Sequence, residues 1–496
     1  MIKKDITLSD AQNAAVDKAV KNKGSILLAH EMGSGKTGAS TAIVEALRAM
    51  DRAHTTLVVT PPNLKTNYGE RGVSKFTDRS YHDIKGPNDA FPSADYYIIS
   101  RDLFKRDPYK YLKGVKPDTL VVDEIHTARN KATDSYKALM AARGAVKNCI
   151  GMTGTPINNK AYDIVPMLDI ISGGNHRLAG GEQAFNQRYI QESTIKGQKI
   201  TQLNPIHRGE FGHEARKMVH TPVESSAGAN KPAVSRTTVE VPMSSEQMKH
   251  VDFALQKVPL YVRFMIKHNL PIDRKEATSV FPMLLQARNV MNSTAYLDKR
   301  KTLEEAAETT PKMRAVLDDI QDHLKGVPDA QVLAHSHFKT GGVHVLSAGL
   351  AGRGIEHGVI TGDTPRAERE ETINKYNAGK LKVVLLSSAG TTGLDFPNTT
   401  LHCAVDGHFN PAVNDQIEAR GVRAFGQSHR NPKERKVEIR RYLSTYPAGI
   451  LQKLHLAKKR HSIDEWVYNT AENKHTLGNQ VYEELKKTAK IWQKLM

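Results

Sequence analysis

The sequence has 496 residues, of which 39% are hydrophobic and 25% charged; this composition is typical of a globular protein too long for one compact core. The formal net charge of +18 predicts a polyanionic partner, with nucleic acid first, although a merely well-solvated basic surface is the alternative. No apolar run is long enough to span a membrane and the N-terminus has no export-signal core, so we expect a cytoplasmic protein with no membrane partner.

Apolar runs separated by helix-like stretches fill the first part of the chain. They predict strands at 25–29, 56–60, 96–100, 119–123 and 148–153. Continuous apolar runs of this kind are typical of a parallel sheet covered on both faces. We therefore expect an α/β unit over residues 1–190. The two cysteines, Cys149 and Cys403, lie in apolar stretches and predict buried free thiols.

The first predicted strand leads into HEMGSGKT (30–37) and then into a helix. Backbone N–H groups of such a loop can wrap nucleotide phosphates, the lysine can reach the outer phosphates, and the threonine hydroxyl can ligate Mg²⁺. The residues of this predicted ATP site are Gly33, Ser34, Gly35, Lys36 and Thr37. His30 departs from the general pattern, because the pattern has its first glycine there.

Two carboxylates, Asp123 and Glu124, leave the end of the apolar run at 119–123. Asp123 can hold Mg²⁺, and Glu124 can orient and polarise the attacking water. A pair of acidic residues that caps a helix is the alternative. A phosphate loop followed by such a strand predicts an enzyme that hydrolyses ATP.

Residues 191–300 are more polar, and we expect a mostly helical insertion there. Within it, LYVRFMIKHNL (260–270) predicts an amphipathic helix, for which packing into a core is favoured over bracing a DNA duplex. Apolar runs resume in 301–445 and predict a second α/β unit with strands near 331–336, 358–362, 383–388, 402–407 and 437–443. Residues 446–496 predict a basic helical tail.

The DEIH tetrapeptide at 123–126 resembles the DExH motif of superfamily-2 helicases. Further segments resemble motifs of the Swi/Snf-like branch in family order: LVVTPPNLKTNY, MTGTPINNK, VLAHSHF, VITGDTPRAERE, LLSSAGTTGLDFPN and DGHFNPAVNDQIEARGVRAFGQSH. The stretches SHRNPKERKVEIRRYL and SIDEWVYNTAENK resemble viral, poxvirus-type or phage members more than chromatin remodellers.

This resemblance implies two tandem RecA-like parallel-sheet lobes with ATP and Mg²⁺ between them. It assigns Gln12 to reading adenine, Gly393 and Asp395 to ATP binding, and Gln416, Arg420 and Arg423 to catalysis. The two arginines, expected on a helix that starts near Gln416, would neutralise charge on the γ-phosphate. Gln416 and Gln427 are eleven positions apart, one more than in the remodellers, while Arg420 and Arg423 keep their expected offsets.

DNA contacts are expected at strand ends and loops, where hydroxyls and backbone N–H groups can bind phosphates. The predicted residues are Thr60, Pro61, Ser100, Arg101, Thr155, Ser336, Thr361, Gly362 and Ser388. Ordinary turn chemistry is the alternative at each of them. Phosphate contacts carry no base identity, so we expect movement along DNA without sequence preference.

Three functions remain open. The first is an ATP-dependent translocase that remodels duplex or branched DNA by branch migration, fork remodelling or protein displacement. The second is a helicase that separates duplexes or RNA–DNA hybrids, which would need a wedge that the sequence does not clearly show. The third is a transcription or packaging partner that uses ATP as a switch, which the complete set of predicted catalytic residues argues against.

Overall fold

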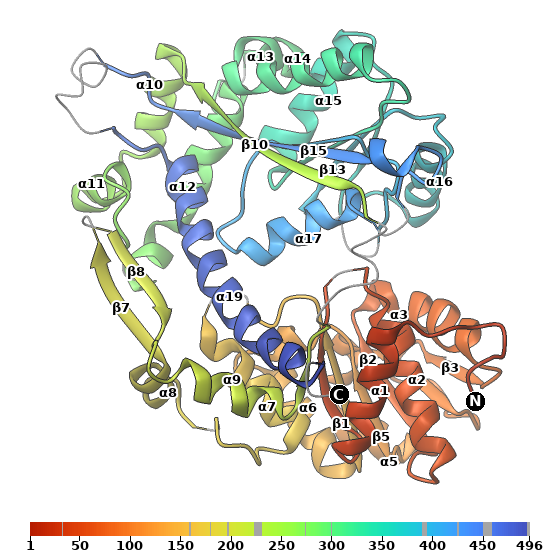
Figure 1. The fold of residues 1–496 in the computed structure, drawn as a ribbon. Helices are drawn as coiled ribbons and strands as arrows, with labels where there is room; N and C mark the ends of the chain where they lie inside the picture. The colour runs from red at the N-terminus through yellow and green to blue at the C-terminus, as the bar shows by residue number, and fades with distance from the viewer. Residues whose placement is uncertain are drawn as a thin grey trace. The chain divides into compact units, whose positions relative to one another are not determined.

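The computed structural model describes residues 1–31, 33–157, 160–178, 180–195, 198–222, 231–272, 274–298, 300–388, 394–423, 426–449 and 459–493. The chain folds into two compact units (Figure 1). Unit 1 comprises Met1–Ser193, Thr201–Ala229 and Lys474–Met496, and unit 2 comprises Thr194–Ile200 and Asn230–Asn473. Each unit is built on its own parallel sheet.

Unit 1 contains a seven-stranded parallel sheet in the order β3-β4-β2-β5-β6-β1-β9. Its strands are β1 (Ser25–Ala29), β2 (Thr56–Thr60), β3 (Tyr81–Ile84), β4 (Tyr96–Ser100), β5 (Thr119–Val122), β6 (Asn148–Thr153) and β9 (Val219–His220). Because side chains alternate along a strand, Ile26 and Leu28 pack into one core layer and Leu27 and Ala29 into the other. Both faces of the sheet are therefore buried, which explains the continuous apolar runs.

Helices cover both faces of this sheet. On one face lie α1 (Asp10–Lys21) and α2 (Lys36–Ala49). The other face is covered by α5 (Pro108–Val115), α6 (Asp134–Ala145) and α7 (Ile164–Ser172). The remaining helices of unit 1 are α3 (Lys65–Asn67), α4 (Arg101–Phe104), α8 (Glu182–Tyr189) and α9 (Arg208–Arg216).

Unit 2 contains a six-stranded parallel sheet in the order β10-β15-β14-β11-β13-β12. The strands are β10 (Ala233–Pro242), β11 (Val332–Ser336), β12 (His357–Ile360), β13 (Val383–Ser387), β14 (Leu401–Ala404) and β15 (Lys436–Thr445). One face packs against α13 (Leu303–Thr309), α14 (Pro311–Gly326) and α15 (His344–Gly352), and the other against α16 (Arg366–Asn377).

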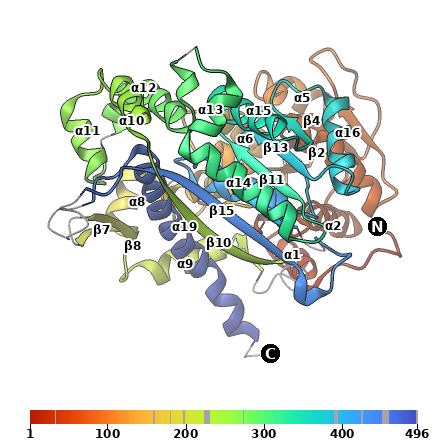
Figure 2. The same cartoon turned by 90° about the horizontal axis from the view of Figure 1, so that it is seen from above.

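Three further helices, α10 (Ser245–Ala254), α11 (Leu260–Lys267) and α12 (Arg274–Asn292), share a separate apolar cluster of unit 2. They lie together beside the sheet in both views (Figures 1 and 2). The long helix α19 (Ile463–Gln493) begins in this cluster, where Ile463, Trp466 and Val467 pack. A small two-stranded sheet pairs β7 (Ile190–Ile195) with β8 (Gln198–Leu203).

The predicted fold class of two parallel-sheet α/β lobes is confirmed, and each strand predicted from an apolar run forms. Cys149 and Cys403 are buried free thiols, as predicted. None of the helices in the described part of the chain is long and apolar enough to cross a membrane.

In its described residues, the predicted mostly helical insertion at 191–300 contains four helices but also contributes strands to both large sheets. Residues 219–220 add β9 to the first sheet, and 233–242 add β10 to the second, where β10 pairs with β15 along its whole length. β9 has only two residues, and β10 is an edge strand whose side chains are mostly exposed. Neither produces an apolar run: β9 is too short for one, and most side chains of β10 face solvent.

The start of α19 is fixed to unit 2 by a buried ion pair. Lys312 Nζ donates to Asp464 Oδ2 at 2.7 Å, and both side chains are almost fully buried. Arg288 Nε lies 3.5 Å from Asp464 Oδ1. Removing Lys312 would leave the buried Asp464 carboxylate with the longer contact to Arg288, and breaking a buried pair in this way costs more than the pair contributes.

We expect Lys312→Met to lower the free energy of unfolding by about 3–5 kcal/mol, because the Asp464 carboxylate loses its buried ammonium partner. Lys301→Met is the matched control, since Lys301 pairs with the half-exposed Glu246 at 2.7 Å and should cost about 1 kcal/mol or less. Urea unfolding of both variants gives the comparison. Equal shifts of the two urea midpoints would show that the buried Lys312 pair contributes no more to stability than the partly exposed Lys301 pair.

Candidate functional site

The loop after β1 is shaped by two glycines and closed by its own lysine. Gly33 and Gly35 have φ of 76° and 80°, which favours glycine, and Gly35 precedes the first residue of α2. Lys36 Nζ donates to the carbonyl oxygens of His30 and Glu31, each at 3.1 Å. The ammonium group therefore lies against the carbonyl oxygens at the beginning of this loop.

The side chain of Gln12 holds the far end of this loop. Its Nε2 donates to the carbonyl oxygen of Gly35 at 3.2 Å, and its Oε1 accepts from Ser9 N at 2.9 Å. A Cβ on Gly35 would come within 2.9 Å of Gln12 Nε2. The structure thus places Gln12 against the phosphate loop, and its predicted role in reading adenine stays a prediction.

The acidic pair follows β5, in the middle of the sheet. Asp123 Oδ2 accepts from Thr60 Oγ1 and Asp123 Oδ1 accepts from Glu124 N, both at 3.0 Å. Burial, and then the charge of Glu124, raise the pKa of Asp123 to about 6, while the charge of Lys36 opposes this shift. The charge of Lys36 thus acts on Asp123, while the catalytic roles of Lys36, Asp123 and Glu124 stay predictions.

Glu124 has a φ of 50°, a left-handed conformation that costs a residue with a side chain about 1–3 kcal/mol. His126 Nδ1 lies 3.2 Å from Glu124 Oε2 and 3.0 Å from Thr153 Oγ1, which also accepts from Thr155 N at 3.0 Å. A polar chain thus joins the ends of β5 and β6. His126 and Thr153 were not among the predicted site residues, although both lie inside motifs that the sequence displayed.

A second feature that the sequence did not reveal lies at the base of the phosphate loop. His30 Nε2 and His220 Nδ1 share a hydrogen bond of 2.7 Å, and His220 belongs to the short edge strand β9. Burial lowers the pKa of His30 to about 3 and that of His220 to about 4, with neighbouring cationic and imidazole groups adding to the effect. Both rings are therefore neutral, so one donates and the other accepts.

Within unit 2, the predicted arginines lie close to one predicted ATP-binding residue. Arg420 and Arg423 each donate to the carbonyl oxygen of Leu394 at 3.4 Å, and Arg423 also forms an ion pair with Asp395. Gly393 lies outside the described residues. The predicted bounds of the helix that carries these residues need correction. Helix α17 (Pro411–Gly421) begins five residues before Gln416, because Asn410 caps its start and Pro411 favours the first turn. It ends before Arg423, so this arginine lies outside the helix.

The predicted DNA contacts differ in exposure. Gly362 is exposed, Ser100, Arg101, Thr155 and Ser388 are half-buried, and Thr60, Pro61, Ser336 and Thr361 are buried. In two of them the hydroxyl has a carboxylate partner within its own unit. The buried Thr60 hydroxyl donates to Asp123, and the buried Ser336 hydroxyl donates to the Asp406 carboxylate. Contact of all nine residues with DNA stays a prediction.

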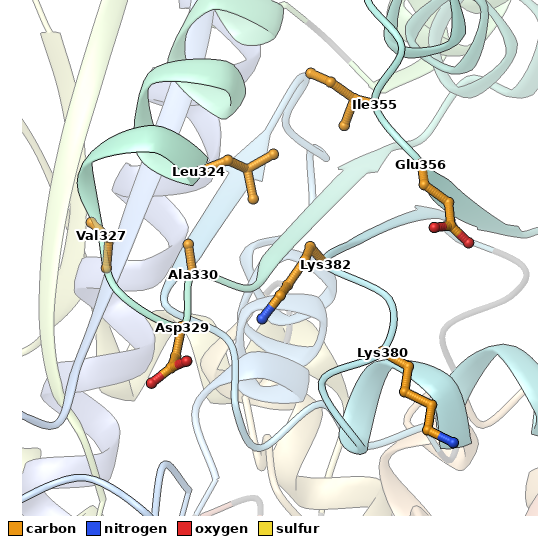
Figure 3. A pocket seen from close by; sticks show the side chains of 8 residues that line it. All are labelled: Leu324, Val327, Asp329, Ala330, Ile355, Glu356, Lys380 and Lys382. Carbon is orange, nitrogen blue, oxygen red and sulfur yellow. The ribbon is translucent and has the colours of Figure 1, made fainter.

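A hollow of about 380 Å³ in unit 2 is lined by Leu324, Ile355, Glu356, Lys380 and Lys382 among others (Figure 3). It lies where β12 and β13 begin, since Glu356 and Lys382 precede these strands directly. The predicted site residues Thr361 and Ser388 follow the other ends of the same strands. Ligands of open parallel sheets bind at the carboxyl ends of the strands, so this hollow is not the predicted site.

The family-level comparison agrees with these motifs. A model of the SNF2-related domain matches residues 13–296, and one of the helicase conserved C-terminal domain matches residues 315–425. The chain belongs to the SNF2-related family. It is thus a Swi/Snf-like member of superfamily 2 and an enzyme of the ATPase/helicase class, as predicted.

Several relatives of this SNF2-related protein are known. A putative ATP-dependent RNA helicase of Acanthamoeba polyphaga mimivirus is 23% identical and covers 96% of each chain. A Caenorhabditis elegans homologue of a SWI/SNF-related chromatin regulator is 24% identical over 94% of this chain and 52% of its own. The Sulfolobus solfataricus SWI2/SNF2 ATPase core, solved with double-stranded DNA, is 18% identical over 97% of each chain with a TM-score of 0.40.

The SNF2-related chain also presents a donor set that suits Mg²⁺. This ion prefers one or two carboxylates together with hydroxyls, water and phosphate oxygens. Thr37, at the second position of α2, and Asp123 would supply a hydroxyl and a carboxylate. The raised pKa of Asp123 marks a buried carboxyl group that a cation would stabilise in its ionised form.

We expect His220→Ala to lower kcat/KM for ATP about tenfold, because loss of the ring leaves His30 with an unsatisfied buried nitrogen beside the phosphate loop. His220→Asn is the matched control, since the asparagine amide lies close to the position of Nδ1 and can keep the bond. Steady-state ATPase assays of the three proteins give the comparison. The role of the hydrogen bond is refuted if the asparagine variant is as impaired as the alanine variant.

The pKa of Asp123 predicts a pH-dependent stability. The folded chain holds this proton more tightly than the unfolded chain, so the stabilising contribution is present below about pH 4 and lost as pH rises through about 6. Asp123→Asn removes the cost of ionisation and should raise Tm by about 3 °C at pH 8 and not at pH 4. Thermal unfolding with chelator and without nucleotide measures this. A Tm difference that does not change with pH would contradict the assignment.

Proposed function

We propose that this SNF2-related protein is an ATP-dependent DNA translocase that remodels duplex or branched DNA without sequence preference. The observation that supports it most is the grouping of Lys36, Asp123 and Glu124 beyond the carboxyl ends of β1 and β5, the two strands that flank β6 in unit 1. An inert scaffold would not retain two half-buried carboxylates side by side next to a phosphate loop, because their mutual repulsion costs stability.

ATP binding is assigned to the loop after β1. The N–H groups at the start of α2 donate to the phosphates, and the helix dipole favours their negative charge. Lys36 exchanges its bonds to the carbonyl oxygens of His30 and Glu31 for phosphate oxygens. Thr37 and Asp123 would hold Mg²⁺, which would supply positive charge that stabilises the phosphates.

Glu124 is the proposed general base. Its strained backbone and its contact with His126 fix the carboxylate at the end of β5, where it accepts a proton from the attacking water. His126 is bonded to Thr153, so movement at the end of β6 changes the orientation of the base. This couples hydrolysis to the loop that contains Thr155, one of the predicted DNA contacts.

Arg420 and Arg423 are proposed to neutralise charge on the γ-phosphate. In unit 2 their guanidinium groups are held by Leu394 and Asp395. Arg423 therefore has an alternative partner, Asp395, when no phosphate is bound. An arginine in this role accelerates hydrolysis about 10³–10⁵-fold.

DNA is the proposed polyanion. The net charge of +18 favours phosphate binding, and the relatives in C. elegans and yeast are described as chromatin regulators or remodelling ATPases. The mimivirus relative is described as an RNA helicase, so strand separation on duplexes or hybrids is the alternative. The match to that viral relative covers 96% of each chain, which supports a viral-type member acting in the cytoplasm of a host cell.

Steady-state ATPase assays without nucleic acid and with single-stranded DNA, duplex DNA, a four-way junction and RNA test the proposal. We expect duplex and junction DNA to stimulate turnover most, with binding that weakens steeply as salt rises. Glu124→Gln should bind ATP and DNA without hydrolysis, and Lys36→Ala should lose turnover entirely. Stimulation by single strands or RNA alone would favour the strand-separating helicase. Basal turnover that no nucleic acid changes would refute both and leave the ATP-switched partner.

A further inference from the structure

Exposed large apolar side chains are concentrated on the helical cluster of unit 2. Phe253 lies on α10, Phe281 on α12, and Leu260, Tyr261 and Phe264 lie on the eight-residue helix α11. The sequence predicted that α11 is amphipathic and packs into a core. Its Val262 and Ile266 do so, but its opposite face stays in solvent.

This exposed face of α11 combines aromatic rings with positive charge. One side of α11 carries residues 260, 261, 264 and 267, because positions three or four apart lie on the same side of a helix. His268, which directly follows the helix, lies on the same side. Leu260, Tyr261 and Phe264 are 75%, 51% and 54% exposed. Lys267 and His268 complete the face, and residues 258–271 contain no carboxylate.

The face is held rigidly. His268 Nδ1 donates to the carbonyl oxygen of Phe264 at 2.8 Å, and the two rings stack with centroids 3.9 Å apart. His461 N donates to the carbonyl oxygen of Lys267 at 3.0 Å, and the Trp466 indole donates to that of Leu270 at 3.0 Å. The C-terminal end of α11 is therefore anchored to the segment that begins α19, and the ring of Phe264 is held against that of His268.

We propose that this face of α11 binds unpaired nucleic-acid bases. A base stacks on Tyr261 or on the Phe264–His268 pair, and Lys267 pairs with a neighbouring phosphate. Flat aromatic rings beside cations suit this ligand, because every base has a π-face and every nucleotide a negative charge. A purely apolar partner would leave the charge of Lys267 uncompensated. An acidic protein surface would pair with Lys267 but would not require flat aromatic rings beside it.

This inference rests on the proposed function and makes it more specific. A translocase that binds branched DNA meets bases that have lost their partners at a junction. Stacking would hold such bases apart after they open, which supplies the wedge that the sequence did not show. Residues Tyr261 and Phe264 are not part of the ATP site in unit 1, so their replacement leaves basal hydrolysis unchanged.

The test is a titration of fluorescent single-stranded DNA and RNA oligonucleotides at fixed low salt, without nucleotide. Tyr261→Ala and Phe264→Ala should each weaken binding about tenfold, the effect of losing one stacked base. Phe264→Trp should keep the affinity and Phe264→Leu should lose it, because leucine retains apolar area without a π-face. Tyr109→Ala, which removes a 71% exposed aromatic ring from unit 1, is the control and should change nothing.

The outcomes separate this inference from the proposed function. If Phe264→Leu binds as tightly as the parent, or if the control weakens binding equally, stacking on α11 is refuted. Loss of self-association on mutation with unchanged oligonucleotide affinity would instead identify the face as a contact between copies of the chain. ATP turnover that duplex DNA stimulates equally in the parent and the Phe264→Ala variant supports the proposed function whichever way the titration falls.

Discussion

The arrangement of the site depends on one constraint, which is parallel strand pairing in the sheet of unit 1. Strand β1 pairs with β6 and β9, and strand β5 pairs with β2 and β6. Parallel strands end at the same edge of a sheet, so residues far apart in the sequence become neighbours there. Lys36 follows β1, Thr60 ends β2, Asp123 follows β5 and Thr153 ends β6. A shift of one residue in any of these registers would turn the functional side chain to the opposite face.

The same strand pairing places two carboxylates side by side at the end of β5, where their ionisation lowers the stability of the fold. Asp123 is buried beside Glu124, and the protein offsets this with the Thr60 hydroxyl, the Glu124 amide and the charge of Lys36 rather than with a permanent ion pair. Unit 2 treats its buried carboxylate differently. Asp406 accepts from Asn292, Ser336 and His337, which lowers the need for a ligand. The contrast is consistent with the binding role proposed for Asp123 and with a structural role for Asp406.

The sequence predicted the elements whose signal is local. Apolar runs identified the central strands, and glycine and lysine spacing identified the phosphate loop, because burial on both faces and a left-handed backbone restrict residue choice. What it missed depends on tertiary contacts. The edge strands β9 and β10 carry no apolar run. The His30–His220 hydrogen bond joins residues 190 positions apart. The hydrogen bond from Thr60 to Asp123 forms because β2 and β5 are adjacent in the sheet. Exposure of Tyr261 and Phe264 was equally hidden, since an amphipathic pattern does not show whether a second apolar side is covered.

These missed contacts explain how the loop keeps its shape before any phosphate binds. Gln12 holds the carbonyl oxygen of Gly35 at one end, and the ring of His220 holds His30 at the other. Between them Lys36 bonds to two carbonyl oxygens of the same loop. Phosphate oxygens can replace those carbonyls as acceptors without rebuilding the backbone, so little conformational entropy is lost on binding. The histidine at the position where the general pattern has glycine is therefore compatible with a working phosphate loop, because its side chain points to β9 and only its carbonyl oxygen faces the lysine.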